Sequence, residues 1–383
     1  MNLTHKDYFK IAFPFIVSTV TQPLLGAVDT AVIGKLGVAE MIGGVAIGTV
    51  IMNTLYWLFG FFRVSTTGQS AIALGKNSPE DQASSLFRPF VISLCLGLIF
   101  IALQSVIWMG AELIISPDAV VAENAKIYFD MGIAGVAVAT LIAQISTFVI
   151  GAVLVLKTCR FTLFDYIQTA KMTRKDLKVI ASSNMDLLLR TVCLLVFFNM
   201  MARVGSQLGS DVLAANAILM QVTFIVSYMF DGVANASSVF AGKAVGQKKT
   251  TLLDNVIKLN TQWTAAFVVV LTLLLVLFKH QLVTLFTTLP NLVELYLNMS
   301  PWLLAFPLVA GFGLTFYGIF TGTGTTRPVR NSTFLTMVLF LVTQFIAVQC
   351  WGNHGLWLAF TLFYVGRFVF LFPYLDQVKQ KCQ

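Results

Sequence analysis

Apolar residues fill this chain of 383 residues in continuous runs of twenty or more positions, separated by short polar segments. An α-helix of about 20 apolar residues crosses a hydrocarbon core about 30 Å thick. Since no water reaches backbone groups there, only helices and closed barrels span it, and continuous rather than alternating runs indicate helices. The pattern therefore predicts an all-α polytopic membrane protein with about ten spans. We place the spans at residues 8–34, 41–74, 89–115, 131–156, 181–205, 211–243, 257–279, 292–322, 331–350 and 355–375.

Basic residues gather in alternate polar segments of this pattern. The longest polar segment, residues 157–178, is rich in Lys and Arg, and so is the stretch 243–258. Arg367, Lys379 and Lys381 near the end of the chain are assigned to the same side of the membrane. Because Lys and Arg accumulate on the cytoplasmic side of membrane proteins, we expect both termini in the cytoplasm of a bacterial cell, in the inner membrane.

The composition supports a membrane protein and disfavours several other classes. Hydrophobic residues make up 57% of the chain, charged residues only 11%, and the mean hydropathy is +0.83, whereas soluble domains carry about 25% charged residues. The net charge of +8 reflects loops beside spans, so no nucleic-acid partner is expected. Five scattered cysteines and three distant histidines give no metal or disulfide pattern. No nucleophile with a base and no phosphate loop is recognisable, so we expect neither an enzyme nor a cofactor.

The basic segment divides the chain into two halves. We expect an N-terminal bundle at residues 1–156, a cytoplasmic linker at 157–180 and a C-terminal bundle at 181–383. Residues 41–76 and 212–247 are weakly similar to each other, since both are long spans rich in Ser, Thr and Ala that close on a glycine. Parallel repeats related by an axis along the membrane normal are a known transporter plan, with substrate bound between the halves.

The first span contains a single acidic residue, Asp29. Ser18, Gln22 and Asp29 fall on one face of an ideal helix, and Pro14 and Pro23 each remove a backbone hydrogen bond and favour a bend. A carboxylate at mid-membrane costs roughly 2.5–3.5 kcal/mol, so it usually faces a bundle interior or a watery cavity. This pattern suits a site for a coupling H⁺ or Na⁺ ion. Alternatively, Asp29 is hydrated near the outer surface and only stabilises the bundle.

The sixth span carries a second polar stripe that includes Asp231 and Asn235 at a spacing of four residues. The stripe either lines a cavity or only bonds neighbouring helices. Aromatic and methionine side chains close to it could form an adaptable apolar cavity for lipophilic cations. The candidates for such a cavity are Tyr56 and Trp57 on the second span and Tyr228 and Met229 on the sixth.

Two further charges lie one helical turn apart in the fifth span. Asp186 and Arg190 have the i,i+4 spacing at which side chains meet on a helix. We expect them to form an ion pair with a structural or gating role. Arg63, near the inner end of the second span, is expected to extend to the lipid headgroups.

Five stretches resemble a known family: "AFPFIVSTVTQPLLGAVDTAVIGKLG", "MGIAGVAVATLIAQ", "NMDLLLRTVCLLVFF", "LAANAILMQVTFIVSYMFDGVANASSVFAGKAVGQ" and "FTGTGTTRPVRNS". The family is that of the multidrug and toxic compound extrusion (MATE) transporters, in the branch of the DNA-damage-inducible protein F. The resemblance implies two helical bundles related by a pseudo-two-fold axis, a central cavity, and rocking driven by proton or sodium entry. It also implies that the first helix bends at Pro14 and binds the coupling ion at Asp29.

The chain departs from the family in its first half. Family members have six helices in each half, whereas the first half here has four spans, which gives 4 + 6. The stretch "SPDAVVAENAKIYFD" at 116–130 is too short and too charged to cross a membrane. The counterparts of the fourth and fifth family helices are missing, and with them a second aspartate and an asparagine of the family's ion site.

These features favour a monomeric secondary active antiporter that exports small lipophilic or cationic compounds across the lipid bilayer in exchange for H⁺ or Na⁺. One alternative is a flippase for lipid-linked precursors from the same superfamily. That class usually has more spans and a basic cavity. Two arginines of the predicted spans, Arg63 and Arg190, are few for such a cavity. Another alternative is a helix-deleted membrane protein that no longer transports.

Overall fold

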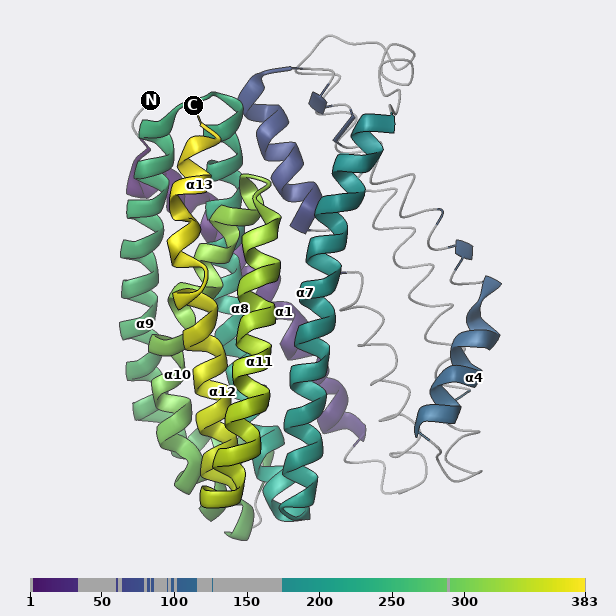
Figure 1. Ribbon diagram of the computed structural model, residues 1–383. Helices are drawn as coiled ribbons and strands as arrows, with labels where there is room; N and C mark the ends of the chain where they lie inside the picture. Colours follow the sequence, from purple (N-terminus) through teal and green to yellow (C-terminus); the bar gives the residue numbers. More distant parts are fainter. Residues whose placement is uncertain are drawn as a thin grey trace. The chain divides into compact units, whose positions relative to one another are not determined.

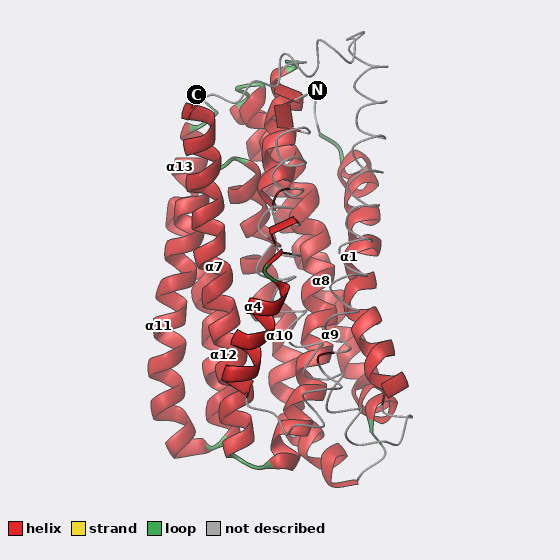
Figure 2. Cartoon of the chain, turned by 90° about the vertical axis from the view of Figure 1, so that its right-hand side faces the viewer, coloured by secondary structure: helices red, strands yellow, loops and turns green. Residues whose placement is uncertain are grey.

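The computed structural model describes residues 3–33, 60, 64–78, 81–82, 84–85, 95, 98–99, 102–115, 126, 174–287 and 290–382. Over these residues the regular structure is helical, and Figure 2 shows the helices joined by short loops. The chain forms two compact units by its internal contacts. Unit 1 consists of Met1–Val28, Thr67–Lys76 and Ser182–Gln383, and unit 2 consists of Asp29–Thr66 and Asn77–Ala181.

Most of the labelled helices belong to unit 1, where they run alongside one another (Figure 1). Helix α4, Gln104–Ile115, belongs to unit 2, and α1 and α7 each cross from one unit to the other. The remaining elements are α1 His5–Ile33, α7 Arg174–Gln207, α8 Ser210–Gly246, α9 Thr250–Phe286, α10 Pro290–Gly322, α11 Thr326–Trp351, α12 Asn353–Val369, the 3-10 helix η1 Phe372–Tyr374, and α13 Leu375–Gln380.

Six membrane-spanning helices lie in the C-terminal part of the chain. In the part of the chain that the structure describes, six stretches are long and apolar enough to cross a membrane, and they coincide with the last six predicted spans. Many of their large apolar side chains point outward, such as Leu277 at 66% exposure and Phe345 at 71%. Such exposure suits a lipid solvent. The prediction of an all-α membrane protein is therefore confirmed.

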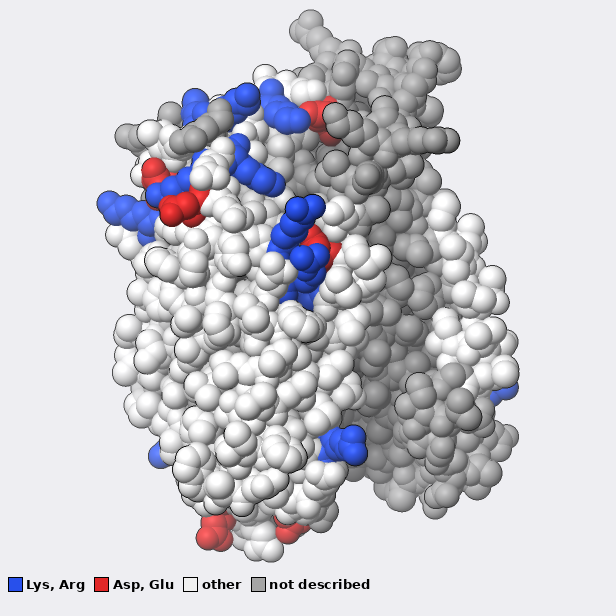
Figure 3. All heavy atoms as spheres, viewed as in Figure 1, with Lys and Arg blue, Asp and Glu red and all other residues white. Residues whose placement is uncertain are grey.

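Charged side chains of unit 1 gather at one end of its helices. Both chain termini lie at that end (Figure 1), and Figure 3 shows most of the visible blue and red atoms there, above a mainly white surface. The turn between α8 and α9 contributes Lys248 and Lys249 to this end, and α13 contributes Lys379. This distribution agrees with the expected cytoplasmic placement of both termini, which stays a prediction.

A capping box starts α1. The Thr4 backbone N–H donates to the Asp7 carboxylate over 3.4 Å, and the Asp7 backbone N–H donates back to Thr4 Oγ1 over 3.2 Å. The Thr4 hydroxyl also donates to the Asp7 carboxylate, over 2.6 Å. This reciprocal arrangement satisfies backbone donors that a helix start leaves open. The hydrogen bonds from Thr4 also stabilise the charged carboxylate, so the pKa of Asp7 lies below its ordinary value.

A single residue, Gly352, joins α11 to α12. Its φ of 53° lies in the left-handed region that glycine adopts without strain. Gly355 follows in the first turn of α12, and a Cβ on it would overlap the backbone carbonyl of Ala347. The two glycines thus allow the chain to reverse at once, and α11 and α12 pack against each other as a close hairpin.

Aromatic side chains form the centre of unit 1. Phe197 on α7 is fully buried and stacks on Phe363 of α12, with ring centroids 3.9 Å apart. Phe340 of α11 meets Phe197 edge-on at 4.7 Å. Offset and edge-on ring pairs of this kind add about 0.5–1.5 kcal/mol beyond their burial. The core therefore fixes α7 against the α11–α12 hairpin.

Unit 1 also includes segments from the first part of the chain, and the expected division at residues 156 and 181 stays a prediction. The first part of α1 and the helical stretch 67–76 pack within unit 1. At Gly75 and Gly246, an added Cβ would overlap the backbone of the facing segment. Glycines permit this close backbone approach between 67–76 and α8, as they do between membrane helices generally.

Candidate transport site

A chain of buried hydrogen bonds ties α1 to unit 1. Tyr8 and Ser237 approach to 2.5 Å through their hydroxyl oxygens, and Ser237 donates to Asn260 Oδ1 over 2.7 Å. Asn260 Nδ2 donates to Thr315 over 3.4 Å, and Thr264 donates to Thr315 over 2.9 Å. All five side chains are fully buried. Because the one proton of Ser237 is given to Asn260, Tyr8 is the donor to Ser237.

Packing contacts reinforce the docking of α1. Thr19 donates through Oγ1 to the carbonyl oxygen of Tyr228 over 2.8 Å, and the ring of Phe9 stacks on Trp263 at 4.7 Å. Gly232 lies against Ile16 so closely that a Cβ would overlap its backbone. The residue after Asp231 therefore has a defined structural reason to be glycine.

The predicted ion-coupling residues lie along α1, a continuous helix from residue 5 to residue 33. Ser18 is exposed. Gln22 and Asp29 lie on the helical backbone, but their side chains fall outside the part that the structure describes. The first segment of unit 1 ends at Val28, and unit 2 begins at Asp29. The candidate acid therefore stands at the point where this helix passes from one unit to the other.

The predicted helix bend of α1 stays a prediction. Pro14 is exposed and lies inside the helix, and Pro23 also lies on the helical backbone. The helix is assigned without a break through both positions, although each proline lacks a backbone N–H.

The candidate cavity residues divide into two groups. Tyr228, Met229, Asp231 and Asn235 are half-buried on α8. The second-span candidates Tyr56 and Trp57, together with Arg63, lie outside the described residues.

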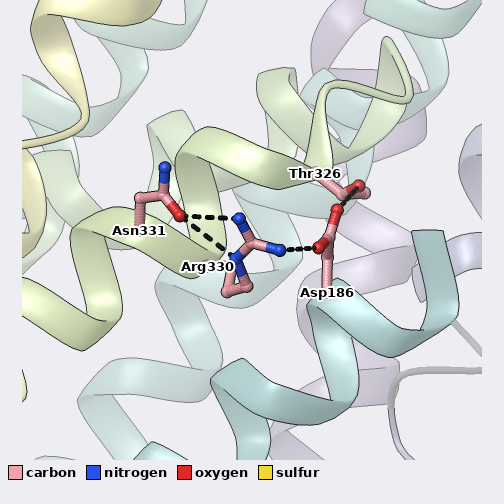
Figure 4. Close-up of polar contacts among 4 residues, drawn as sticks. All are labelled: Asp186, Thr326, Arg330 and Asn331. Carbon is pink, nitrogen blue, oxygen red and sulfur yellow. Dashed lines mark hydrogen bonds and ion pairs between the residues drawn. The ribbon is translucent and has the colours of Figure 1, made fainter. Parts of the chain in front are cut away.

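The expected ion pair between Asp186 and Arg190 does not form. Arg330 of α11 donates through Nη1 to Asp186 over 2.7 Å, and Thr326 donates to the other carboxylate oxygen over 2.9 Å (Figure 4). Asn331 accepts two hydrogen bonds from the same guanidinium. Asp186 is turned toward α11, away from the next turn of its own helix. The carboxylate thus joins α7 to α11.

The second arginine of that prediction belongs to another group. The guanidinium carbon of Arg190 lies 4.2 Å from the ring centroid of Tyr317 on α10. Arg367 of α12 lies 5.8 Å from the ring of Tyr364 and is only 5% exposed. Arg190, Tyr317 and Asp231 are all electrostatic neighbours of Arg367. We call these five residues the arginine cluster.

The assignment of Arg367 to the cytoplasmic side together with Lys379 and Lys381 stays a prediction. The Arg367 side chain is buried within the bundle, in the last turn of α12. The predicted span 355–375 already included Arg367, so the sequence did indicate a position within a membrane helix. Tyr317 of the cluster and the Tyr8 chain had no comparable signal, since the partners of these tyrosines are far away in the sequence.

Comparison with known proteins identifies the family. The model of the MatE family matches residues 14–168 and again residues 187–346. The chain belongs to the MATE family. Because one family model matches both halves, the two halves share a sequence pattern, as the comparison of 41–76 with 212–247 suggested.

Two named relatives and two solved structures agree with this assignment. DNA damage-inducible protein F of Escherichia coli K12 is 27% identical over 413 residues, covering 94% of this chain and 90% of the relative. Probable multidrug resistance protein NorM of Photorhabdus laumondii is 26% identical over 135 residues, covering 35% of this chain and 30% of that protein. A crystal structure of MATE in the straight conformation covers 100% of this chain and 97% of its own, with TM-score 0.78 and 16% identity. An outward-facing MATE transporter gives TM-score 0.79 with 17% identity, covering 99% and 98%.

The family resemblance is thus confirmed, and the protein is a membrane-embedded transporter of the multidrug type. Members of this family are in general not enzymes. The alignment with the Escherichia coli protein is 413 residues long, which exceeds the 383 residues of this chain. Part of that relative therefore has no counterpart here, and the shortening of the first half stays a prediction.

Proposed function

We propose that this MATE protein is a secondary active antiporter of a bacterial inner membrane. It exports lipophilic or cationic compounds in exchange for H⁺ or Na⁺, with Asp29 as the coupling group and Gln22 and Ser18 beside it. The observation that carries the proposal is the division of α1. Its first part is docked in unit 1, and the helix enters unit 2 at Asp29.

Charge at this position can drive a conformational change. A ligand shifts a two-state equilibrium only by as much as it binds one state better than the other. A proton or Na⁺ ion bound at Asp29 removes a charge whose burial is costly in a bundle interior. Because the preceding turns of α1 are held by Tyr8, Thr19 and Gly232, that change acts on a helix fixed at its start.

The half-buried side of α8 supports a substrate surface. Tyr228 and Met229 offer apolar and polarisable contacts, and Asp231 and Asn235 add polar groups. Flexible methionines beside aromatic rings suit binding of varied apolar compounds. Together with Tyr56 and Trp57, these residues are the proposed contacts of the exported compound.

Transport by the purified protein in lipid vesicles tests this proposal. Vesicles that contain the full chain are given a proton or a sodium gradient, and movement of ethidium is followed by fluorescence. Native protein should move ethidium, and collapse of one gradient by a protonophore or a sodium ionophore identifies the ion. Asp29→Asn should abolish transport at equal insertion, because an amide keeps the shape but binds no proton and carries no charge.

Asp254→Asn provides the matched control. Asp254 is an exposed carboxylate paired with Lys379 over 2.9 Å, so its loss should leave transport unchanged. Full ethidium transport by the Asp29→Asn variant would remove Asp29 from the mechanism.

One observation favours the flippase alternative. The structure adds the buried Arg367 to Arg190 inside the C-terminal bundle, and guanidinium groups suit the phosphates of lipid-linked precursors. Movement of such a lipid across vesicles, with no movement of ethidium, would establish this second function. No movement of either compound would indicate a membrane protein that does not transport.

A further inference from the structure

The arginine cluster has more hydrogen-bond donors than the described residues satisfy. Each guanidinium offers five N–H donors and no acceptor. Nε of Arg190 is buried without a hydrogen-bond partner. In the part of the chain that the structure describes, neither Arg190 nor Arg367 has a carboxylate within ion-pair distance, and the Asp186 carboxylate is engaged by Arg330.

The charges of the cluster do not balance among these residues. Arg367 has both Arg190 and Asp231 as electrostatic neighbours, so the cluster holds two positive groups and one carboxylate. The tyrosine rings under the guanidiniums stabilise cations only modestly. An unpaired charge inside a bundle is strongly unfavourable and is normally matched by an opposite charge or a bound ligand.

The cluster is also partly accessible. Arg367, Tyr364 and Tyr317 are buried, but Arg190 and Asp231 are only half-buried. All five residues lie within unit 1, on α7, α8, α10 and α12. Arg190 and Asp231 are therefore the members of the cluster with uncovered surface, whereas Arg367 and the two tyrosines are covered by other residues.

From this geometry we propose that Arg190 and Arg367 bind the acidic group of an anionic amphiphile, a carboxylate, sulfonate or phosphate carried on an apolar body. The planar fork of arginine matches such groups through paired hydrogen bonds. The inference deepens the proposed export function, and it rests on that function for the step in which the bound amphiphile is exported. It extends the exported compounds beyond cations. The same chemistry is offered by a free amphiphile and by the phosphate of an anionic lipid headgroup.

Equilibrium binding of two matched probes tests this site without requiring transport. The full chain is placed in phosphatidylcholine nanodiscs, and binding of tritiated dodecanesulfonate and of tritiated dodecyltrimethylammonium is measured by scintillation proximity. The probes share one apolar chain and differ in the sign of the charge. Native protein should bind the sulfonate at least about tenfold more tightly than Arg190→Gln or Arg367→Gln, since a hydrogen-bonded charge is lost.

The controls separate binding from folding. Lys279→Gln removes a positive charge from an exposed position on α9 and should leave both affinities unchanged. Arg190→Lys and Arg367→Lys keep the charge and most of the volume, so they retain the fold if Gln does not, and should bind the sulfonate a few-fold more weakly. The cation should bind all the arginine variants at least as well as it binds native protein.

The outcomes decide both the site and the source of its ligand. Equal sulfonate affinity in native protein and in the arginine variants overturns the proposal, and so does an equal loss for both probes, which indicates a structural role. If phosphatidylglycerol nanodiscs weaken sulfonate binding to native protein but not the residual binding of the Gln variants, the lipid headgroup occupies the site. Otherwise the occupant is a free amphiphile. Failure of ethidium export with intact sulfonate binding would reject the proposed transport and leave the site standing.

Discussion

The docking of α1 on α8 depends on the absence of a side chain at Gly232, and Gly232→Ala measures this dependence. A Cβ at this position would lie 2.5 Å from Cα of Ile16 and 2.7 Å from its backbone nitrogen. Both atoms belong to the backbone, so rotation of a side chain cannot relieve the overlap. The helices must separate, and overpacking of this kind costs about 1–3 kcal/mol.

An opposing gain reduces this cost only in part. Alanine in a helix is favoured over glycine by about 0.5–1 kcal/mol. Since the overlap is with backbone, we expect a net loss of about 1–2 kcal/mol in the docking of α1. That loss corresponds to roughly a 5- to 30-fold increase in the population in which α1 is released.

Gly205→Ala is the matched control on α7. A Cβ there would lie 3.4 Å from Nδ2 of Asn216 and 3.5 Å from a methyl group of Leu213, which are ordinary contacts. This variant should be as stable as native protein, or more stable by up to about 1 kcal/mol.

Hydrogen exchange followed by mass spectrometry provides the assay. In Gly232→Ala, amides of residues 9–20 should exchange about 5- to 30-fold faster than in native protein, while peptides from α9 change little. Unchanged exchange in α1, with native thermal stability, would show that α1 is not held against α8 as the structure describes.

Three other predictions follow from particular contacts and from the charge pattern. Tyr8→Phe should raise the exchange of α1 amides by an amount equivalent to about 0.6 kcal/mol, the average for hydrogen bonds between membrane helices, and at most about 1.7 kcal/mol; no change would mean that the hydroxyl contributes nothing. Arg330→Gln should lower the melting temperature by removing about 1–3 kcal/mol from the α7–α11 contact, and Asp186→Asn in the same chain should recover part of the loss, since it removes the unpaired charge. Without recovery, the ion pair is not what Arg330 contributes. In a background without native cysteines, Asp118→Cys should react with an impermeant maleimide in intact cells, and Lys171→Cys only after the membrane is opened; the reverse labelling would overturn the predicted orientation.

The sequence alone determined the membrane class and the spans of the C-terminal half. Span length and hydropathy are properties of one continuous segment, because each helix satisfies its own backbone in lipid. For this reason the predicted spans 181–205 and 292–322 match helices of the structure. The half-buried face of α8 with Asp231 and Asn235 was also foreseeable, since helical spacing places them on one side. Family motifs added the assignment to the MATE transporters.

Tertiary structure alone decided which polar side chains meet. Asp186 had a suitable neighbour one turn away in Arg190, yet it pairs with Arg330, which lies 144 residues farther along the chain. Tyr8 bonds to Ser237 across 229 residues, and Arg367 joins the arginine cluster from α12. The partner of a side chain depends on how each helix is rotated about its axis and on which helices pack together. Those variables are set by the fit of the whole bundle, including the aromatic core and the glycine contacts, and local spacing does not contain them.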